Sequence, residues 1–241
     1  MKATAHGVNS ELFRNVIKYK SGNKSVAISV IDFDDDAFVR IGWVDIRGHE
    51  INDKPYHPGE EITSKAPDKL DMLAREIENL SRRSWGGTEI HKALELSQKM
   101  FIASPWQTME RRVVDVFGDG SDSYILVADR RDRLAEMGVT VNGFAIANED
   151  QSLPQWYGDY VRTVTETKGP DGLYSQPGQV WVVARDMQQF NNSSSTLKSF
   201  FGEVARGMRQ KISVEVGGLD NYYRTLARLN RMPDFPLPAN N

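Results

Sequence analysis

The sequence predicts an α/β fold in which helices cover both faces of a doubly wound, mostly parallel sheet with one antiparallel edge strand. Short, nearly continuous apolar segments, of the kind buried in parallel sheets, alternate with segments in which apolar residues recur at helical spacing. The 241 residues, 39% hydrophobic and 26% charged, are enough for one domain with a sizeable core. In such a domain the ligand site lies at the carboxyl ends of the strands.

The N-terminal part of the chain predicts a helix followed by a β-hairpin. The helix is expected over residues 9–19, and its first residue, Asn9, is a suitable N-cap. Residues 25–33 and 38–46 have the composition of strands, and the Asp34-Asp35-Asp36 segment between them suits a hairpin turn, so the strands are expected to be antiparallel. A helix over about residues 68–82 follows a loop that contains Gly and Pro.

The rest of the domain is expected to alternate helices and strands. In order, these are a helix over residues 89–103, a strand over 112–117, a helix over 124–137, a strand over 139–146, a helix over 153–165, a strand over 179–184 and a helix over 196–212. Residues 1–213 are expected to form the domain. Residues 214–241 are expected to form a C-terminal extension, whose sequence is compatible with a strand, a short amphipathic helix and a Pro-rich tail.

Composition and charge exclude several classes of function. The net charge of −3 gives no field that would recruit nucleic acid or an acidic membrane surface. The chain has no cysteine, which excludes disulfides, thiolate metal sites and thiol catalysis. No apolar run approaches the roughly 18 residues of a membrane span, and the first residues lack the hydrophobic core of a signal peptide. A soluble protein is expected, cytoplasmic by default.

Two glycine-rich segments place oxygen-bearing side chains where predicted strands and helices meet. Gly86-Gly87-Thr88 precedes a helix, and Gly118-Asp119-Gly120-Ser121 follows an apolar strand. Hard oxygen ligands on two loops above a parallel sheet are typical of half of a Mg²⁺ or Mn²⁺ site. The four histidines show no metal-ligand spacing, and His91 stands alone on its helix, so we expect them to be surface or capping residues.

These segments, in this order, resemble the von Willebrand factor type A family, also called the integrin I-domain family, in the style of an uncharacterised bacterial branch. The resemblance covers roughly residues 8–213 and rests on the hairpin, the two glycine-rich segments and the later strands. It implies a metal-ion-dependent adhesion site built from an Asp-x-Ser-x-Ser loop, a threonine and an aspartate. Thr88 and Asp119 match the last two.

The serine loop of that metal site has no counterpart in the sequence. The positions where the resemblance implies Asp, Ser and Ser are Ala3, Ala5 and Gly7, and none has an oxygen-bearing side chain. A degenerate site with only Thr88 and Asp119 depends on water ligands, so Mg²⁺ or Mn²⁺ is expected to bind weakly or not at all. Without metal, Thr88 is explained as an N-cap that contributes about 1 kcal/mol, and Asp119 as a turn residue.

The first, central strand of the family's fold is also expected to be absent or truncated. Its loss would leave two ladders of backbone donors and acceptors unpaired, which a buried sheet does not tolerate. We expect an incomplete or degenerate N-terminus, including a true start upstream of Met1. The alternatives are a strand stub at residues 2–6, or a strand supplied by residues 212–216 or by another chain.

The hairpin invites one enzymatic interpretation. An apolar strand that ends in Asp32-Phe33-Asp34 resembles the nucleophile loop of haloacid dehalogenase-like phosphatases. That resemblance implies Asp32 as nucleophile, Asp34 as acid/base, and Asp119 and Asp122 as metal ligands. The strand that begins directly after Asp36 favours a solvated hairpin turn instead.

The sequence therefore predicts a non-enzymatic, protein-binding domain with an incomplete metal site. Binding to another protein is expected through the loops around residues 86–88, 118–123 and 148–154. One alternative is a structural or assembly subunit that docks or self-associates through a strand or through residues 214–241. A second alternative is the phosphatase that uses Asp32 and Asp34.

Overall fold

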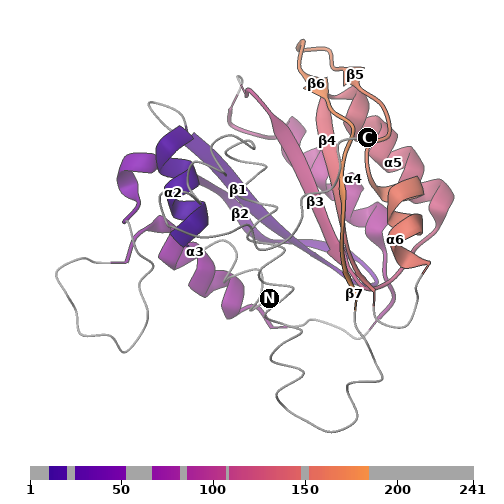
Figure 1. Ribbon diagram of the computed structural model, residues 1–241, viewed down its shortest axis with the longest axis horizontal. Helices are drawn as coiled ribbons and strands as arrows, with labels where there is room; N and C mark the ends of the chain where they lie inside the picture. The colour runs from indigo at the N-terminus through magenta and orange to yellow at the C-terminus, as the bar shows by residue number, and fades with distance from the viewer. Residues whose placement is uncertain are drawn as a thin grey trace, which may run out of the picture. The chain divides into compact units, whose positions relative to one another are not determined.

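The computed structural model describes residues 11–20, 25–52, 67–81, 86–106, 109–147 and 152–184. These residues form helices, a parallel three-stranded sheet and two-stranded pairings, so the predicted α/β class is confirmed (Figure 1). They divide into two compact units, each of which takes in segments that are far apart in the sequence. The predicted closing helix over 196–212, the extension over 214–241, and Ala3, Ala5 and Gly7 lie outside the described residues.

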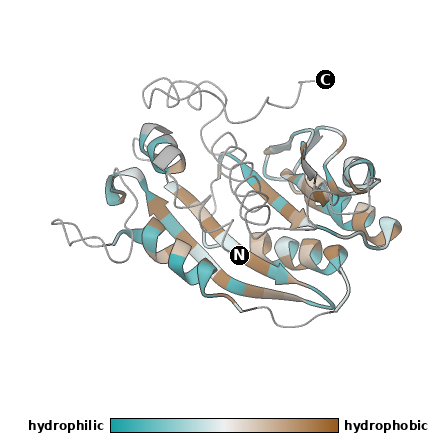
Figure 2. Cartoon of the chain, turned by 60° about the horizontal axis from the view of Figure 1, so that its bottom comes forward, coloured by the Kyte–Doolittle hydropathy of each residue, from teal (hydrophilic) through white to brown (hydrophobic). Residues whose placement is uncertain are grey.

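The first unit holds most of the predicted hairpin and the helices on either side of it in the sequence. Its elements are α2 (Glu11–Lys20), most of β1 (Ser25–Phe33) and β2 (Ala37–Arg47), the 3-10 turn η1 (Gly48–Glu50), and α3 (Lys69–Glu78). The predicted hairpin and helices are confirmed, and β1 has the predicted bounds. The core of this unit is formed by the buried side chains of Phe13, Ile17, Ile41, Ile46, Ile51, Leu70, Leu73, Ala74 and Ile77. Hydrophobic residues recur along the strands in Figure 2.

A buried charge network joins α2 to the start of α3. Arg14 is fully buried, and its guanidinium donates hydrogen bonds to the carboxylates of Asp68 and Asp71. Asp68 is also the N-cap of α3, because its Oδ1 accepts from the backbone N–H groups of Leu70 and Asp71 at 2.9 and 3.1 Å. Burial raises the pKa of the Asp68 carboxyl, but hydrogen bonds from Arg14 and from the backbone outweigh burial and lower it overall. One carboxylate therefore starts α3 and neutralises a buried cation.

The second unit is built on a parallel sheet. Its strands lie in the order β3 (Arg112–Gly118), β4 (Val139–Ala147) and β7 (Val180–Ala184), and all three strands were predicted (Figure 1). β4 is buried along almost its whole length, which agrees with its continuous apolar sequence. Since parallel strands end at one edge of the sheet, the loop that follows β3 lies at that edge.

Helices α4 (Ile90–Ile102) and α5 (Tyr124–Glu136) complete this sheet unit. α4 packs against β3 and α5, and α5 packs against β4. The tip of the hairpin, Ile31–Val39, also belongs to this unit. None of the helices within the described ranges is long and apolar enough to cross a membrane.

The predicted helix over residues 153–165 ends four residues early, at Val161. The observed elements are α6 (Leu153–Trp156), a π-helical turn η2 (Tyr157–Val161), and two short antiparallel strands, β5 (Thr167–Lys168) and β6 (Tyr174–Ser175). The helix ends early because Thr163 pairs with β4. The Val141 N–H donates to Thr163 Oγ1 at 2.8 Å, and the Thr163 N–H donates to the Val141 carbonyl at 2.9 Å. Helical spacing of apolar residues could not reveal this tertiary pairing.

Candidate functional site

Three loops of the second unit hold the residues that the sequence singles out. They are the hairpin turn at Asp34-Asp35-Asp36, the segment from Gly86 to Glu89 that leads into α4, and the segment from Asp119 to Ser123 between β3 and α5. Asp35, Gly86, Gly87, Asp119 and Ser121 are exposed to solvent. The predicted site residues are therefore on the surface.

The hairpin turn holds the glycine loop in place. The Asp35 carboxylate accepts a hydrogen bond from the Gly87 N–H, and the Asp34 carbonyl accepts from the Glu89 N–H at 2.8 Å. A Cβ on Gly86 would lie 1.7 Å from the Asp35 carboxylate, so only glycine fits there while the loop keeps this contact. Lys92 adds a third contact, because its Nζ donates to the Asp35 carbonyl at 2.5 Å. The sequence predicted the turn and the glycine loop, but not their pairing.

Thr88 and the Asp119 loop also meet. The Thr88 hydroxyl oxygen lies 2.5 Å from the position that a Cβ on Gly120 would occupy. Thr88 therefore lies against the residue that follows Asp119, and whether Thr88 and Asp119 bind a metal ion together stays a prediction. The expectation that Thr88 caps α4 is wrong. The helix begins at Ile90 with Glu89 as its N-cap, and Glu89 makes no side-chain capping bond.

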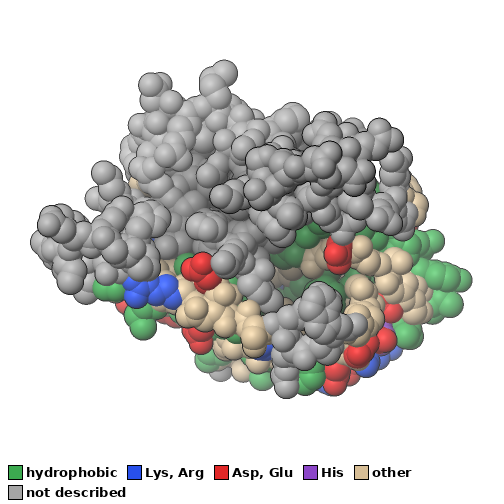
Figure 3. All heavy atoms as spheres, turned by 90° about the horizontal axis from the view of Figure 1, so that it is seen from below, with side chains coloured by type: hydrophobic (Ala, Val, Ile, Leu, Met, Phe, Trp, Pro, Cys, Tyr) green, Lys and Arg blue, Asp and Glu red, His purple; other side chains and the backbone are tan. Residues whose placement is uncertain are grey.

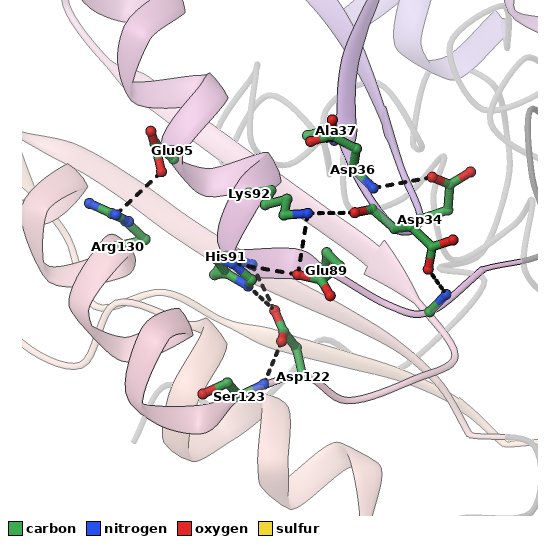
Figure 4. A network of polar contacts seen from close by, with 12 residues as sticks. Asp34, Asp36, Ala37, Glu89, His91, Lys92, Glu95, Asp122, Ser123 and Arg130 are labelled. Atoms are coloured by element: carbon green, nitrogen blue, oxygen red, sulfur yellow. Dashed lines mark hydrogen bonds and ion pairs between the residues drawn. The ribbon is translucent and has the colours of Figure 1, made fainter.

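Asp122, from the loop before α5, accepts a side-chain hydrogen bond at the start of α4. Its Oδ2 accepts a hydrogen bond from the His91 N–H at 2.9 Å and contacts His91 Nδ1 at 2.8 Å (Figure 4). Glu89 lies near the other ring nitrogen, with its Oε2 3.5 Å from His91 Nε2 and 3.8 Å from Lys92 Nζ. One ligand atom from each of Glu89, His91 and Asp122 fits within 4.8 Å of the others.

His91 is therefore not the isolated helix histidine that the sequence predicted. It is a partner of two carboxylates, and Asp122 reaches it from a separate loop. His91 lies at the start of one predicted helix and Asp122 lies just before the next one, but neither segment carries a sequence signal for their pairing. The spacing of the four histidines from one another carried no such signal.

A buried tyrosine underlies the Asp119 loop. Tyr157 is fully buried, and its hydroxyl has no hydrogen-bond partner among the described residues. Cβ atoms on Gly118 and Gly143 would lie 2.5 Å from the Tyr157 hydroxyl and 2.7 Å from its ring, so both glycines leave room for the side chain. Burial raises the pKa of the Tyr157 hydroxyl, and the negative charge of Asp119 raises it further. The hydroxyl is therefore neutral at physiological pH.

The residues of the phosphatase interpretation take local structural roles. The Asp36 N–H donates to Asp34 Oδ1 at 3.3 Å within the hairpin turn, as the solvated-turn interpretation expects. Asp122 Oδ1 accepts from the Ser123 N–H, and its Oδ2 is engaged with His91. Asp32 lies in β1 and is half-buried.

The sequence and the fold are similar to those of known proteins. Residues 61–168 match the model of a family described as a protein of unknown function (DUF1194). No curated protein matches the chain. Three solved structures have a similar fold. The conserved hypothetical protein BatB from Bacteroides thetaiotaomicron is 17% identical, with a TM-score of 0.41 over 81% of this chain and 84% of that one.

The other two structures are longer than this chain. Proximal thread matrix protein 1 from the mussel byssus, with a zinc-occupied MIDAS motif, is 15% identical, with a TM-score of 0.44 over 81% of this chain and 40% of its own. A von Willebrand factor type A protein from Catenulispora acidiphila is 13% identical, with a TM-score of 0.43 over 86% of this chain and 38% of its own. The chain thus spans less than half the length of these two proteins.

Proposed function

We propose, from the premise that the chain is von Willebrand factor type A-like, that it is a non-enzymatic module that binds another protein. The binding surface consists of the loops Gly86-Gly87-Thr88 and Gly118-Asp119-Gly120-Ser121, together with the first turn of α5. Mg²⁺ or Mn²⁺ binds at Thr88 and Asp119 weakly or not at all, because these two side chains supply too few hard ligands.

The observation that carries this proposal is a row of exposed apolar side chains beside the Asp119 loop. Tyr124, Ile125 and Leu126 are 54%, 63% and 43% exposed at the start of α5. Exposed aromatic and aliphatic groups next to polar loops are typical of protein-interaction surfaces, where the apolar groups act as anchors. On the face seen in Figure 3, acidic side chains likewise lie beside hydrophobic ones.

The charge of the loops indicates the chemistry of the partner. Asp35, Asp36 and Asp119 are exposed around the loops, and Lys92 is drawn back onto the Asp35 carbonyl. Without a metal ion this surface is acidic and repels a carboxylate. The partner we propose therefore presents an apolar side chain flanked by Lys or Arg.

Selection of a random phage-displayed peptide library against the full chain in EDTA tests this proposal. We expect peptides with Lys or Arg around an apolar residue, and at least tenfold weaker binding to Ile125→Asp. The matched control is Ile102→Asp, because Ile102 is 69% exposed at the far end of α4. Equal binding by wild type and Ile125→Asp, or equal losses in the two variants, would contradict the proposed surface.

A melting experiment tests the metal part separately. Mg²⁺ or Mn²⁺ at about 1 mM is expected to raise the melting temperature by little or nothing, since stabilisation by a ligand depends on the ratio of its concentration to its dissociation constant. A large increase that Asp119→Ala abolishes would show that the partial site binds the ion well. The same preparation, incubated with a generic phosphoester, tests the non-enzymatic assignment. Hydrolysis that disappears in Asp32→Asn would overturn that assignment.

A further inference from the structure

We propose that Glu89 and His91 bind a divalent transition-metal ion such as Zn²⁺ at the start of α4, with Asp122 orienting the imidazole. This site is separate from Thr88 and Asp119 in both its residues and its chemistry. Imidazole nitrogen suits Zn²⁺, Ni²⁺ or Cu²⁺, whereas the hydroxyl and carboxylate of the other pair suit Mg²⁺ or Mn²⁺.

Asp122 fixes the tautomer of His91. The contact between Asp122 Oδ2 and His91 Nδ1 is 2.8 Å, a hydrogen-bond distance, and a carboxylate has no proton to donate. His91 Nδ1 therefore carries the hydrogen. In the neutral imidazole the lone pair is then on Nε2. The same Oδ2 accepts the His91 N–H at 2.9 Å, and Asp122 is almost buried, so the ring is held from two sides.

A second Lewis base lies near His91 Nε2. Glu89 Oε2 lies 3.5 Å from it, farther than an ordinary N–H···O hydrogen bond and close enough for two lone pairs to repel each other. A cation between the two atoms removes this repulsion. With metal–ligand bonds of about 2.0–2.1 Å, a separation of 3.5 Å corresponds to an angle of about 115° at the metal, close to the tetrahedral geometry that Zn²⁺ prefers.

The arrangement matches a known pattern of metal sites. A ligating histidine generally donates its other ring N–H to a carboxylate, which orients the ring and makes the ligating nitrogen more basic. Asp122 occupies that position toward His91 Nδ1, and Glu89 approaches Nε2 (Figure 4). Glu89 and His91 supply two ligands, and the remaining positions are open to water or to a group from a binding partner.

The local charge favours a cation but limits its affinity. Glu89 and Asp122 carry negative charges, and Lys92 Nζ, 3.8 Å from Glu89 Oε2, offsets one of them. The partial positive charge at the start of α4 also opposes a cation. Replacement of Lys92 by methionine is therefore expected to tighten Zn²⁺ binding.

Isothermal titration of the full chain with ZnCl₂ at pH 7.5 tests the site. We expect Glu89→Gln and His91→Asn each to weaken Zn²⁺ binding at least tenfold, and Asp122→Asn to weaken it about 10–100-fold. The controls are His49→Asn, an exposed histidine of the other unit, and Asp119→Asn, and both are expected to bind within twofold of wild type. Circular dichroism shows whether each variant is folded, which matters most for Asp122→Asn because Asp122 caps α4.

Nitrogen-15 spectra of histidine-labelled protein provide a measurement that a structural role alone would not alter. Zn²⁺ is expected to shift the Nε2 resonance of His91, with Nδ1 still protonated. The proposal is overturned if Glu89→Gln binds Zn²⁺ as wild type does. It is also overturned if both ring nitrogens of His91 are protonated at pH 7.5 and millimolar Zn²⁺ leaves them so, because the imidazolium would then bridge the two carboxylates itself.

Discussion

Two clusters in this protein each place one nitrogen base between two carboxylates, and they differ in how many protons the base can donate. In the first unit, the guanidinium of Arg14 donates to both Asp68 and Asp71, and all three side chains are at least 95% buried. In the second unit, the imidazole of His91 contacts Asp122 at 2.8 Å and Glu89 at 3.5 Å, with its side chain 15% exposed.

This difference separates a structural cluster from a binding cluster. Arg14 has enough donors for both acceptors, so the buried charges are compensated and nothing needs to be added. His91 in its neutral form has one ring N–H for two carboxylates, which leaves a position for the metal ion that we propose. A nitrogen base with two carboxylates therefore stabilises the first unit, and a similar set of groups forms a candidate ligand site in the second.

Removal of Arg14 is expected to have the largest effect on stability. Arg14→Met leaves two buried carboxylates without their partner, and we expect a loss of about 3–5 kcal/mol in the free energy of unfolding, measured with urea. Arg47→Met is the control, because Arg47 is largely exposed and pairs with Asp45 at 3.5 Å. The control is expected to change stability by less than about 1 kcal/mol. Equal losses in the two variants would break the distinction between the clusters.

Removal of Asp122 is expected to lower the free energy of unfolding by less than removal of Arg14 does, because the backbone N–H and imidazole of His91 that lose their partner are nearer to water. Asp122→Ala removes the acceptor for the His91 N–H, and we expect a loss of about 1–2 kcal/mol, as for other helix caps. Asp129→Ala, which removes an exposed pair with Arg133 at 3.1 Å, is the control and should change little. If Asp122→Ala destabilised as much as Arg14→Met, the second cluster would be structural as well.

Acid is expected to lower the free energy of unfolding through the cluster of Arg14, Asp68 and Asp71, by less than either substitution above. Since the pKa of Asp68 is lowered in the folded state, its contribution is present above the unfolded pKa of about 4 and is lost as pH falls through the lower folded pKa. Urea midpoints measured between pH 6 and pH 2 should therefore fall most steeply below pH 4. Asp68→Asn keeps an N-cap residue and should flatten that part of the curve. An unchanged curve would show that Asp68 does not contribute this pH dependence.

The smallest expected effect is a slight gain in stability rather than a loss. Tyr157→Phe removes a buried hydroxyl that has no partner among the described residues, so the free energy of unfolding should stay constant or rise by up to about 1 kcal/mol. Tyr160→Phe, at a half-buried tyrosine, should leave it unchanged. A clear loss in Tyr157→Phe would mean that the hydroxyl has a partner, such as an ordered water near Asp119.

Periodicity and turn residues predicted most of the elements that the structure describes. β1 matches its predicted range, and β4 begins at the predicted residue, because each is an apolar run bounded by turn residues. The end of the helix at Val161 could not be predicted, because it depends on Thr163 pairing with the backbone of Val141. Local sequence shows which face of an element is apolar but not which distant backbone it meets.

The site was predicted only where its residues follow a local pattern. Thr88 and Asp119 were identified from glycine-rich loops, and the structure places Thr88 against Gly120, next to Asp119. The pairing of His91 with Asp122 was missed, because it joins the first turn of α4 to a loop 31 residues away and leaves no pattern in either segment. The buried pair of Arg14 and Asp71 was missed for the same reason.

The side chain of Tyr157 bears on how readily the Asp119 loop can bind. Its ring and hydroxyl occupy the space that Gly118 and Gly143 leave open, so the end of β3 cannot slide along β4 without displacing a fully buried aromatic group. The start of the loop that follows Gly118 is thereby anchored to the sheet. A preorganised loop loses less conformational entropy on binding, so even a small contact surface can give useful affinity.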